Sequence, residues 1–174
     1  MMSKMRASGY LLALGVFVLD QAVKWIMLGP LALREVGQIV LLPIFNFTYV
    51  ENHGVSLGLL TANSATQRWL LVALTAAIAT GVAVWIAREK NRWDRFALGL
   101  VLGGALGNIL DRARLGYVVD FLDLHFGAFR PFMIFNVADA AITCGVVLLL
   151  ARSLLLRDKP AQPAGETPAS ETVQ

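Results

Sequence analysis

The chain has few of the residues that build disulfides, metal sites and common hydrolase centres. Its 174 residues include one cysteine, Cys144, and two histidines, His53 and His125. A single cysteine cannot form a disulfide within the chain or supply a thiolate metal site. The two histidines lie far apart with no ligand spacing, which excludes a zinc peptidase of the His-Glu-x-x-His type. We therefore expect no bound metal and no cofactor.

Charged residues are also scarce. They make up 16% of the chain, against roughly 25% in a soluble domain, while hydrophobic residues make up 57%. Four stretches are near the ~20 residues that a transmembrane helix needs: about 10–28, 69–87, 96–113 and 132–151. The sequence thus predicts an all-α membrane protein with four transmembrane helices, forming a single domain over residues 1–157.

The first stretch has two possible interpretations. Lys4 and Arg6 precede it, as basic residues precede the apolar region of a secretory signal. That region runs only about 7–15 residues and ends at small residues, whereas this one continues into Asp20–Lys24. We expect it to be retained as a membrane anchor.

The distribution of basic residues predicts the orientation. Lys and Arg in short loops mark the cytoplasmic side of a membrane. One side of the predicted bundle carries Lys4, Arg6, Arg88, Lys90, Arg92, Arg95, Arg152, Arg157 and Lys159; the other carries Arg34, Arg68, Arg112, Arg114 and Arg130. Both termini are therefore expected in the cytoplasm, and loops 29–68 and 112–131 outside. The net charge of +3 reflects this orientation and indicates no nucleic acid partner.

Two segments depart from the helical pattern. Between Ile39 and Leu60, aromatic residues alternate with other residues at strand spacing (Phe45, Phe47 and Tyr49, followed by Leu57 and Leu59), and the sequence 51–54 carries a turn signal. We expect a small extracytoplasmic β-sheet within residues 29–67. It is either a simple connecting hairpin or a platform whose aromatic face enters the lipid headgroups and holds a lipid-linked substrate. Residues 158–174 are rich in Pro, Ala, Glu, Ser and Thr, which predicts a disordered cytoplasmic tail.

Two aspartates stand in apolar surroundings. Asp120 follows the third span, and Asp139 lies in the fourth. An ionised carboxylate in hydrocarbon is costly, so such a residue is either functional or paired. With a span beginning at Phe132, Asp139 is expected roughly 10 Å deep at 1.5 Å per residue. The two acids can then meet near the outer surface and share a proton, as the pair of an aspartic peptidase does.

Other polar residues fall at helical spacing. Asp20 and Lys24 are four residues apart and can neutralise each other, which favours a structural ion pair over direct catalysis. Gly99, Gly103 and Gly107 form small-x-x-x-small repeats that let another helix approach closely. Two further sets are predicted to support the site: a cluster of Asn108, Asp111 and Arg112, and an inward polar stripe of Asn136, Asp139 and Thr143.

Together these motifs resemble those of the lipoprotein signal peptidases, or signal peptidase II. The matching segments, in the family's order across about residues 10–151, are Asp20–Lys24, Asn52–Gly54, Gly107–Arg112, Val119–Phe121 and Phe135–Asp139. The resemblance implies four transmembrane helices with a periplasmic β-cradle. It also implies a catalytic dyad of Asp120 and Asp139, and supporting residues at Asp20, Asn52, Asn108, Arg112 and Asn136. Lys24, Gly54 and Asp111 lie within the same motifs, and we expect them to support the site as well. One departure is Val55–Gly58, where the family often has Ala-Ala-Phe-Ser.

The resemblance further implies the substrate and location. The expected activity is an aspartic endopeptidase that removes signal peptides from prolipoproteins, cleaving before a diacylglyceryl-modified cysteine with an activated water. The expected partners are these substrates and membrane lipids, and the enzyme is expected as a monomer in the bacterial inner membrane with its site near the periplasmic face. Four other classes of protein fit the sequence less well. A proton-coupled transporter would show an internal repeat, and a presenilin-type peptidase would show the motif Gly-x-Gly-Asp; the sequence has neither. A serine enzyme would need a histidine partner for its nucleophile, and the sequence offers no plausible one. A structural assembly factor would not need both acids.

Overall fold

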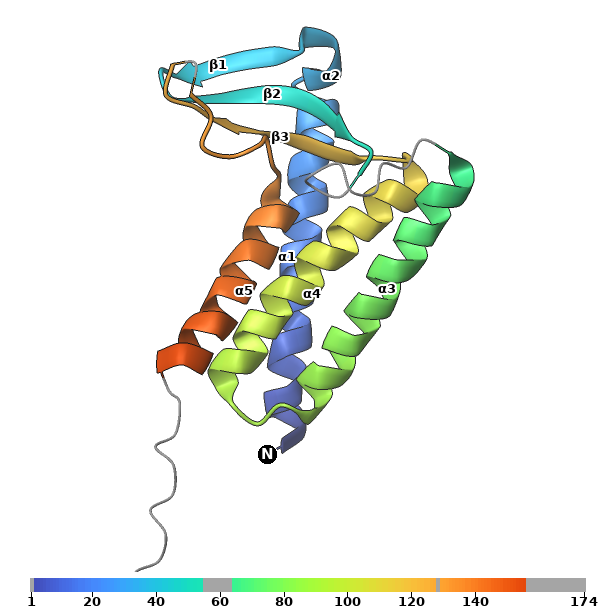
Figure 1. Cartoon of the computed structure of the whole chain (residues 1–174), viewed down its shortest axis with the longest axis vertical. Coiled ribbons are helices and arrows are strands. Elements are labelled where there is room, and N and C mark those ends of the chain that lie inside the picture. The colour runs from blue at the N-terminus through green and yellow to red at the C-terminus, as the bar shows by residue number, and fades with distance from the viewer. Residues whose placement is uncertain (1, 55–63, 128, 156–174) are drawn as a thin grey trace, which may run out of the picture.

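Four long helices form a bundle in the computed structural model, which describes residues 2–54, 64–127 and 129–155. They are α1 (Met2–Leu28), α3 (Ala65–Arg88), α4 (Arg92–Arg114) and α5 (Val137–Leu155) (Figure 1). Each helix is long and apolar enough to cross a membrane. The prediction of four membrane-spanning helices is confirmed.

Side-chain caps mark where two of these helices begin. At the start of α3, the Gln67 N–H donates to Ser64 Oγ over 3.2 Å and the Ser64 N–H donates to Gln67 Oε1 over 3.1 Å, which is a capping box. At the start of α4, the Trp93 N–H donates to Asn91 Oδ1 over 2.8 Å. Both caps satisfy backbone donors that have no partner inside a helix.

The helix α5 begins at Val137, five residues later than predicted. The Asp139 N–H donates to Asn136 Oδ1 over 2.8 Å, so Asn136 caps the helix and does not belong to it. Asp139 therefore lies in the first turn, and the predicted depth of roughly 10 Å is wrong. The apolar run 132–135 concealed this boundary, because hydrophobicity alone does not distinguish a helix from an extended segment.

The helix α4 lies at the centre of the bundle. In the most apolar part of α4, 56% of the residues are buried, against 28% or fewer in each of the other three helices. Its glycines explain the close packing. A Cβ atom on Gly103 would lie 2.5 Å from the Ala13 carbonyl oxygen of α1, and one on Gly104 would collide with the Ala138 carbonyl oxygen of α5. The close approach predicted for the repeat of Gly99, Gly103 and Gly107 is confirmed against α1, and Gly104, outside that repeat, allows the same approach to α5.

A three-stranded antiparallel sheet covers one end of the bundle (Figure 1). The short helix α2 (Leu33–Val36) leads into β1 (Gln38–Leu42), which pairs with β2 (Phe45–Asn52). The third strand, β3 (Val118–Leu124), follows α4 and pairs with β2. A sheet after the first helix was predicted, but its third strand comes from a segment far along the chain.

The predicted strand pairing needs correction. Glu51 and Asn52 lie within β2, not in a turn, and the tight turn of the hairpin is at Pro43–Ile44. The predicted strand at Leu57–Leu59 lies outside the described residues, as do Val55–Gly58 and the tail 158–174. The pairing of β2 with β3 joins residues about 70 positions apart. Turn signals are local, so they could not indicate it.

The aromatic residues of β2 pack mostly inward. Phe47 and Tyr49 are half-buried against a cluster that includes Met27, Leu33 and Phe121. The rings of Phe47 and Phe121 meet edge to face, with centroids 6.3 Å apart. The predicted free aromatic face on these two residues is therefore wrong. They join the sheet to the end of α1, and in doing so hold β3 above the bundle.

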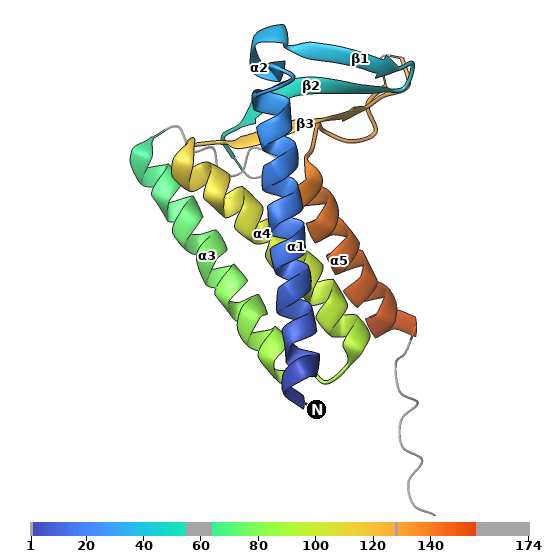
Figure 2. The same cartoon turned by 180° about the vertical axis from the view of Figure 1, so that it is seen from behind.

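The sheet and the helix ends define two sides of the molecule. The sheet lies at the end of α1 that leads into it and at the beginning of α5, as both views show (Figures 1 and 2). The start of α1, the connection between α3 and α4, and the end of α5 lie together at the opposite end (Figure 2). Of the basic segments that the sequence groups on one side, those within the described residues, namely the start of α1, residues 88–95 and Arg152, share one end of the bundle.

Candidate active site

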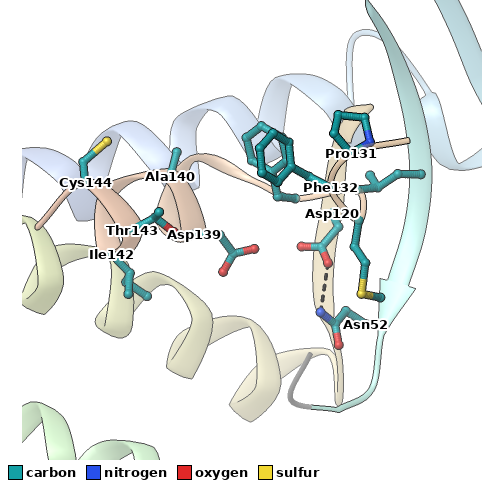
Figure 3. A pocket seen from close by; sticks show the side chains of 12 residues that line it. Asn52, Asp120, Pro131, Phe132, Asp139, Ala140, Ile142, Thr143 and Cys144 are labelled. Carbon is teal, nitrogen blue, oxygen red and sulfur yellow. Dashed lines mark hydrogen bonds between the residues drawn. The ribbon is translucent and has the colours of Figure 1, made fainter. Parts of the chain in front are cut away.

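The two aspartates meet where the sheet joins the bundle. Asp120 lies in β3 and is buried, with 2% of its surface exposed, and Asp139 lies in the first turn of α5. Both line a cavity of about 610 Å³. Figure 3 shows their carboxyl groups facing each other across it. The structure therefore brings together the two acids that the sequence places on one side of the membrane.

Asn136 joins the two acids directly. Its Nδ2 donates to Asp120 Oδ1 over 2.7 Å, and its Oδ1 accepts from the Asp139 N–H. The side chain is fully buried, so both ends of its amide face protein groups and not bulk water. A single amide thus orients one carboxylate and caps the helix that carries the other. The sequence predicted a supporting role for Asn136 but placed it inside the helix.

Two further asparagines hold one carboxylate each. Asn52, at the end of β2, donates from Nδ2 to Asp120 Oδ2 over 3.0 Å (Figure 3). Asn108, on α4, donates from Nδ2 to Asp139 Oδ1 over 2.7 Å. Both contacts are hydrogen bonds to carboxyl groups, and a hydrogen bond to a carboxylate is stronger than one between neutral partners. The three asparagines come from three different parts of the chain, so the site depends on the whole fold.

Burial and a like charge tune Asp120. Removal from water raises the pKa of this carboxyl, and the nearby Asp139 carboxylate raises it further. The hydrogen bonds from Asn52 and Asn136 favour the ionised form and oppose these effects. The resulting pKa is about 7. Near neutral pH, Asp120 can therefore either hold or release a proton, which is what acid–base catalysis requires.

Arg112 is linked to the dyad through Gly54 and Asn52. Its Nη2 donates to the Gly54 carbonyl oxygen over 3.0 Å, and the Gly54 N–H donates to Asn52 Oδ1 over 3.1 Å. This chain of contacts orients the Asn52 amide so that its Nδ2 faces Asp120. The Arg112 charge also interacts with both carboxylates of the dyad.

A second polar cluster lies between α1 and α4. The Nζ atom of Lys24 is 2.8 Å from Asp20 Oδ2 and 2.7 Å from Asp111 Oδ2. The predicted pairing of Asp20 with Lys24 is confirmed, but Lys24 is shared with a second acid. Asp111 was grouped with Asn108 and Arg112, and that grouping is wrong. Asn108 and Arg112 lie one turn apart and both face the dyad, whereas Asp111, about 100° around the helix from Arg112, faces Lys24 of α1.

Some residues of the site carried no clear sequence signal. Gln21 donates from Nε2 to Asp111 Oδ1 over 3.0 Å and to Asp20 Oδ2 over 3.2 Å. Only its position beside Asp20 hinted at this. The segment 131–135 forms an apolar wall of the cavity, together with side chains of α5 that include Thr143 and Cys144. Among the described residues, no group of three or more His, Cys, Asp or Glu side chains could hold a metal ion.

The arrangement of two carboxylates facing one cavity at the end of the helix bundle agrees with the sequence comparisons. The family model described as signal peptidase (SPase) II matches residues 12–155. The chain belongs to the signal peptidase II family. It is therefore an endopeptidase of the aspartic type, and the resemblance seen in the motifs is confirmed.

Close relatives and solved structures support this family membership. The lipoprotein signal peptidase of Rhizorhabdus wittichii is 57% identical over 159 residues, covering 91% of this chain and 92% of the relative. That of Sphingopyxis alaskensis is 56% identical over 154 residues, covering 88% and 89%. A bacterial membrane enzyme solved by the in meso method at 2.3 Å resolution has a similar fold, with a TM-score of 0.72, 27% identity, and coverage of 90% of this chain and 95% of that one.

Proposed function

We propose that this signal peptidase II removes the signal peptide from prolipoproteins, cutting just before a diacylglyceryl-modified cysteine with Asp120 and Asp139 as its catalytic dyad. The observation that carries the proposal is the pair of carboxylates facing each other across one cavity (Figure 3). The relatives named lipoprotein signal peptidases support the substrate class. The position of the cut rests on the motif resemblance.

The dyad supplies both the acid and the base of the reaction. One carboxylate takes a proton from water, whose oxygen attacks the carbonyl carbon of the peptide bond, while the other, protonated, donates to the carbonyl oxygen. The tetrahedral intermediate then collapses as its C–N bond breaks: the base gives its proton to the leaving amine, and a hydroxyl group of the intermediate returns a proton to the other carboxylate. Water is the nucleophile, so no acyl-enzyme forms.

The rest of the cavity suits a substrate that is partly lipid. Phe132 and Met133 on its wall are 63% and 69% exposed, and Ala140 and Ile142 line it from the membrane-spanning helix α5. These apolar side chains offer a surface for acyl chains and the hydrophobic signal peptide, while the peptide bond lies beside the dyad. Binding energy gained there can hold the bond in place for attack.

The supporting residues keep the dyad in position. This role is proposed for Asp20, Lys24, Asn52, Gly54, Asn108, Asp111, Arg112 and Asn136. The enzyme acts as a monomer in the bacterial inner membrane, among its lipids, with both termini in the cytoplasm. The clustering of basic residues away from the sheet supports this orientation, which places the dyad near the periplasmic face.

The test is cleavage of a synthetic lipidated prolipoprotein peptide by purified enzyme in detergent. Asp120→Asn and Asp139→Asn should each abolish cleavage while the protein stays folded and inserted. Asp94→Asn is the matched control: Asp94 pairs with Arg152 Nε over 2.7 Å at the opposite end of the bundle, so its loss should spare the rate. Substantial cleavage by either dyad variant would rule out the mechanism. Cleavage of an unlipidated peptide at an equal rate would rule out the substrate class.

A further inference from the structure

The buried cluster around Lys24 contacts the two chain segments that carry the dyad. The Val119 N–H donates to Asp111 Oδ2 over 3.2 Å, and Val119 directly precedes Asp120. The Ala138 N–H donates to Asp20 Oδ1 over 3.0 Å, and Ala138 directly precedes Asp139. Each acid of the cluster thus holds the backbone of the residue next to one catalytic acid.

Lys24 joins these two contacts. Its ammonium lies 2.8 Å from Asp20 and 2.7 Å from Asp111, and all three side chains are almost completely buried. Two buried carboxylates so close together would repel each other without a cation between them. The ammonium therefore holds Asp20 and Asp111 at a set distance, and with them the backbone of α5 and of β3.

The packing around the cluster leaves little room for adjustment. A Cβ atom on Gly107 would collide with Asp20 Oδ2, so α4 has no side chain at the point where the carboxylate passes. Asp20 itself reaches the first turn of α5, where backbone N–H groups have no partner within the helix and an anion is favoured. The Asp20 carboxylate is thus held between Gly107 of α4 and the Ala138 N–H of α5.

We propose that Lys24 is a positioning residue that sets the separation of the two catalytic carboxylates. It does so through Asp111, which holds the backbone of β3, and through Asp20, which holds the backbone at the start of α5. The inference rests on the proposed function of the dyad. This role of Lys24 differs from that of a simple ion pair between helices. An ion pair that only joined α1 to α4 would affect stability and leave the separation of the dyad carboxylates unchanged.

Separation of the carboxylates has a measurable signature. The closer two acids lie, the further apart their two apparent titrations are, because loss of the second proton places like charges together. The acid and alkaline limbs of the pH profile of kcat therefore report the distance within the dyad. The charged groups around it are Arg112 and Asp111 on α4, Asp20 and Lys24 on α1, and the dyad itself.

The first experiment compares Lys24→Met with Arg152→Met on the lipidated peptide in detergent. Arg152→Met breaks an ion pair between α4 and α5 at the far end of the bundle, so it controls for the loss of an ion pair as such. We expect Lys24→Met to lower kcat by on the order of tenfold to a hundredfold, to bring the two pH limbs closer together, and to leave KM unchanged. Arg152→Met should change neither kcat nor the limbs.

Asp111 provides a second pair of variants in case Lys24→Met does not fold. Asp111→Asn and Asp111→Leu both leave a neutral Lys24–Asp20 pair, so neither buries an unpaired charge. The asparagine keeps an oxygen that can accept from the Val119 N–H, whereas leucine does not. We expect Asp111→Leu to lose most of kcat and to bring the acid and alkaline limbs closer together. Asp111→Asn should retain most of kcat and most of the spacing between the limbs.

A small amine can test the role of the charge itself. A second cavity of about 320 Å³ is lined by Lys24, Asp111, Trp25 and Arg114. Propylammonium ions should enter it in Lys24→Ala enzyme and raise kcat, and propanol at the same concentration should not. The inference is overturned if propylammonium does not raise kcat in Lys24→Ala. It is also overturned if Lys24→Met or Asp111→Leu has the kcat and the pH limbs of the wild type. Activity in Asp120→Asn would instead overturn the proposed dyad, so the two failures are distinguishable.

Discussion

Replacing Asn136 should damage stability and catalysis together, because one amide serves both. In Asn136→Ala, α5 loses its cap, which costs about 1 kcal/mol, and Asp120 loses a buried hydrogen bond of 2.7 Å, which costs about 2 kcal/mol when the acceptor is charged. We therefore expect the free energy of unfolding in detergent to fall by about 3 kcal/mol. The rate should fall as well, since Asp120 is no longer oriented.

Two further variants separate these effects. Asn136→Ser keeps a hydroxyl oxygen that can cap α5 but loses the amide that donates to Asp120, so it should retain more stability than Asn136→Ala while losing activity. Asn91→Ala removes the cap of α4, where Asn91 accepts from Trp93 N–H, and should cost about 1 kcal/mol without changing the rate. Thermal unfolding and peptide cleavage would be measured on the same preparations. If Asn136→Ala matches Asn91→Ala in both assays, the bridging role of Asn136 is refuted.

Three further predictions concern pH and packing. Burial and Asp139 raise the pKa of Asp120 to about 7. We therefore expect kcat to fall as the pH rises through that value, and the free energy of unfolding to fall as the pH rises from about 4 to 7. A flat rate across pH 7 would contradict this. Gly103→Val should lower the melting temperature more than Gly81→Val, whose added Cβ meets nothing within 4 Å. Phe47→Ala should cost about 2 kcal/mol and Val40→Ala much less, because Val40 is 71% exposed; equal losses would show that Phe47 is not part of the cluster.

Local patterns in the sequence were enough to predict the four helices and the meeting of Asp120 and Asp139. The four apolar runs are long, and an i, i+4 spacing placed Asp20 against Lys24 because both lie on one helix. The two isolated acids were conspicuous in apolar surroundings, and the structure places them in one cavity.

Contacts between distant segments could not be predicted in this way. The pairing of β2 with β3 and the contact of Asp111 with Lys24 depend on how the segments meet in space. The boundary at Asn136 could have been found, since an asparagine three residues before an acid is an N-cap pattern. It was missed because the surrounding apolar run was taken as one helix.

The origin of the active-site residues has a consequence for synthesis of the enzyme. The side chains that hydrogen-bond to the dyad come from β2, α4 and the start of α5, and one member of the dyad lies on α5 itself. A nascent chain that has inserted only its first three long helices therefore lacks Asp139 and the cap that joins it to Asp120. On the proposed mechanism, peptidase activity would begin only once the last helix has been made and has packed against α4.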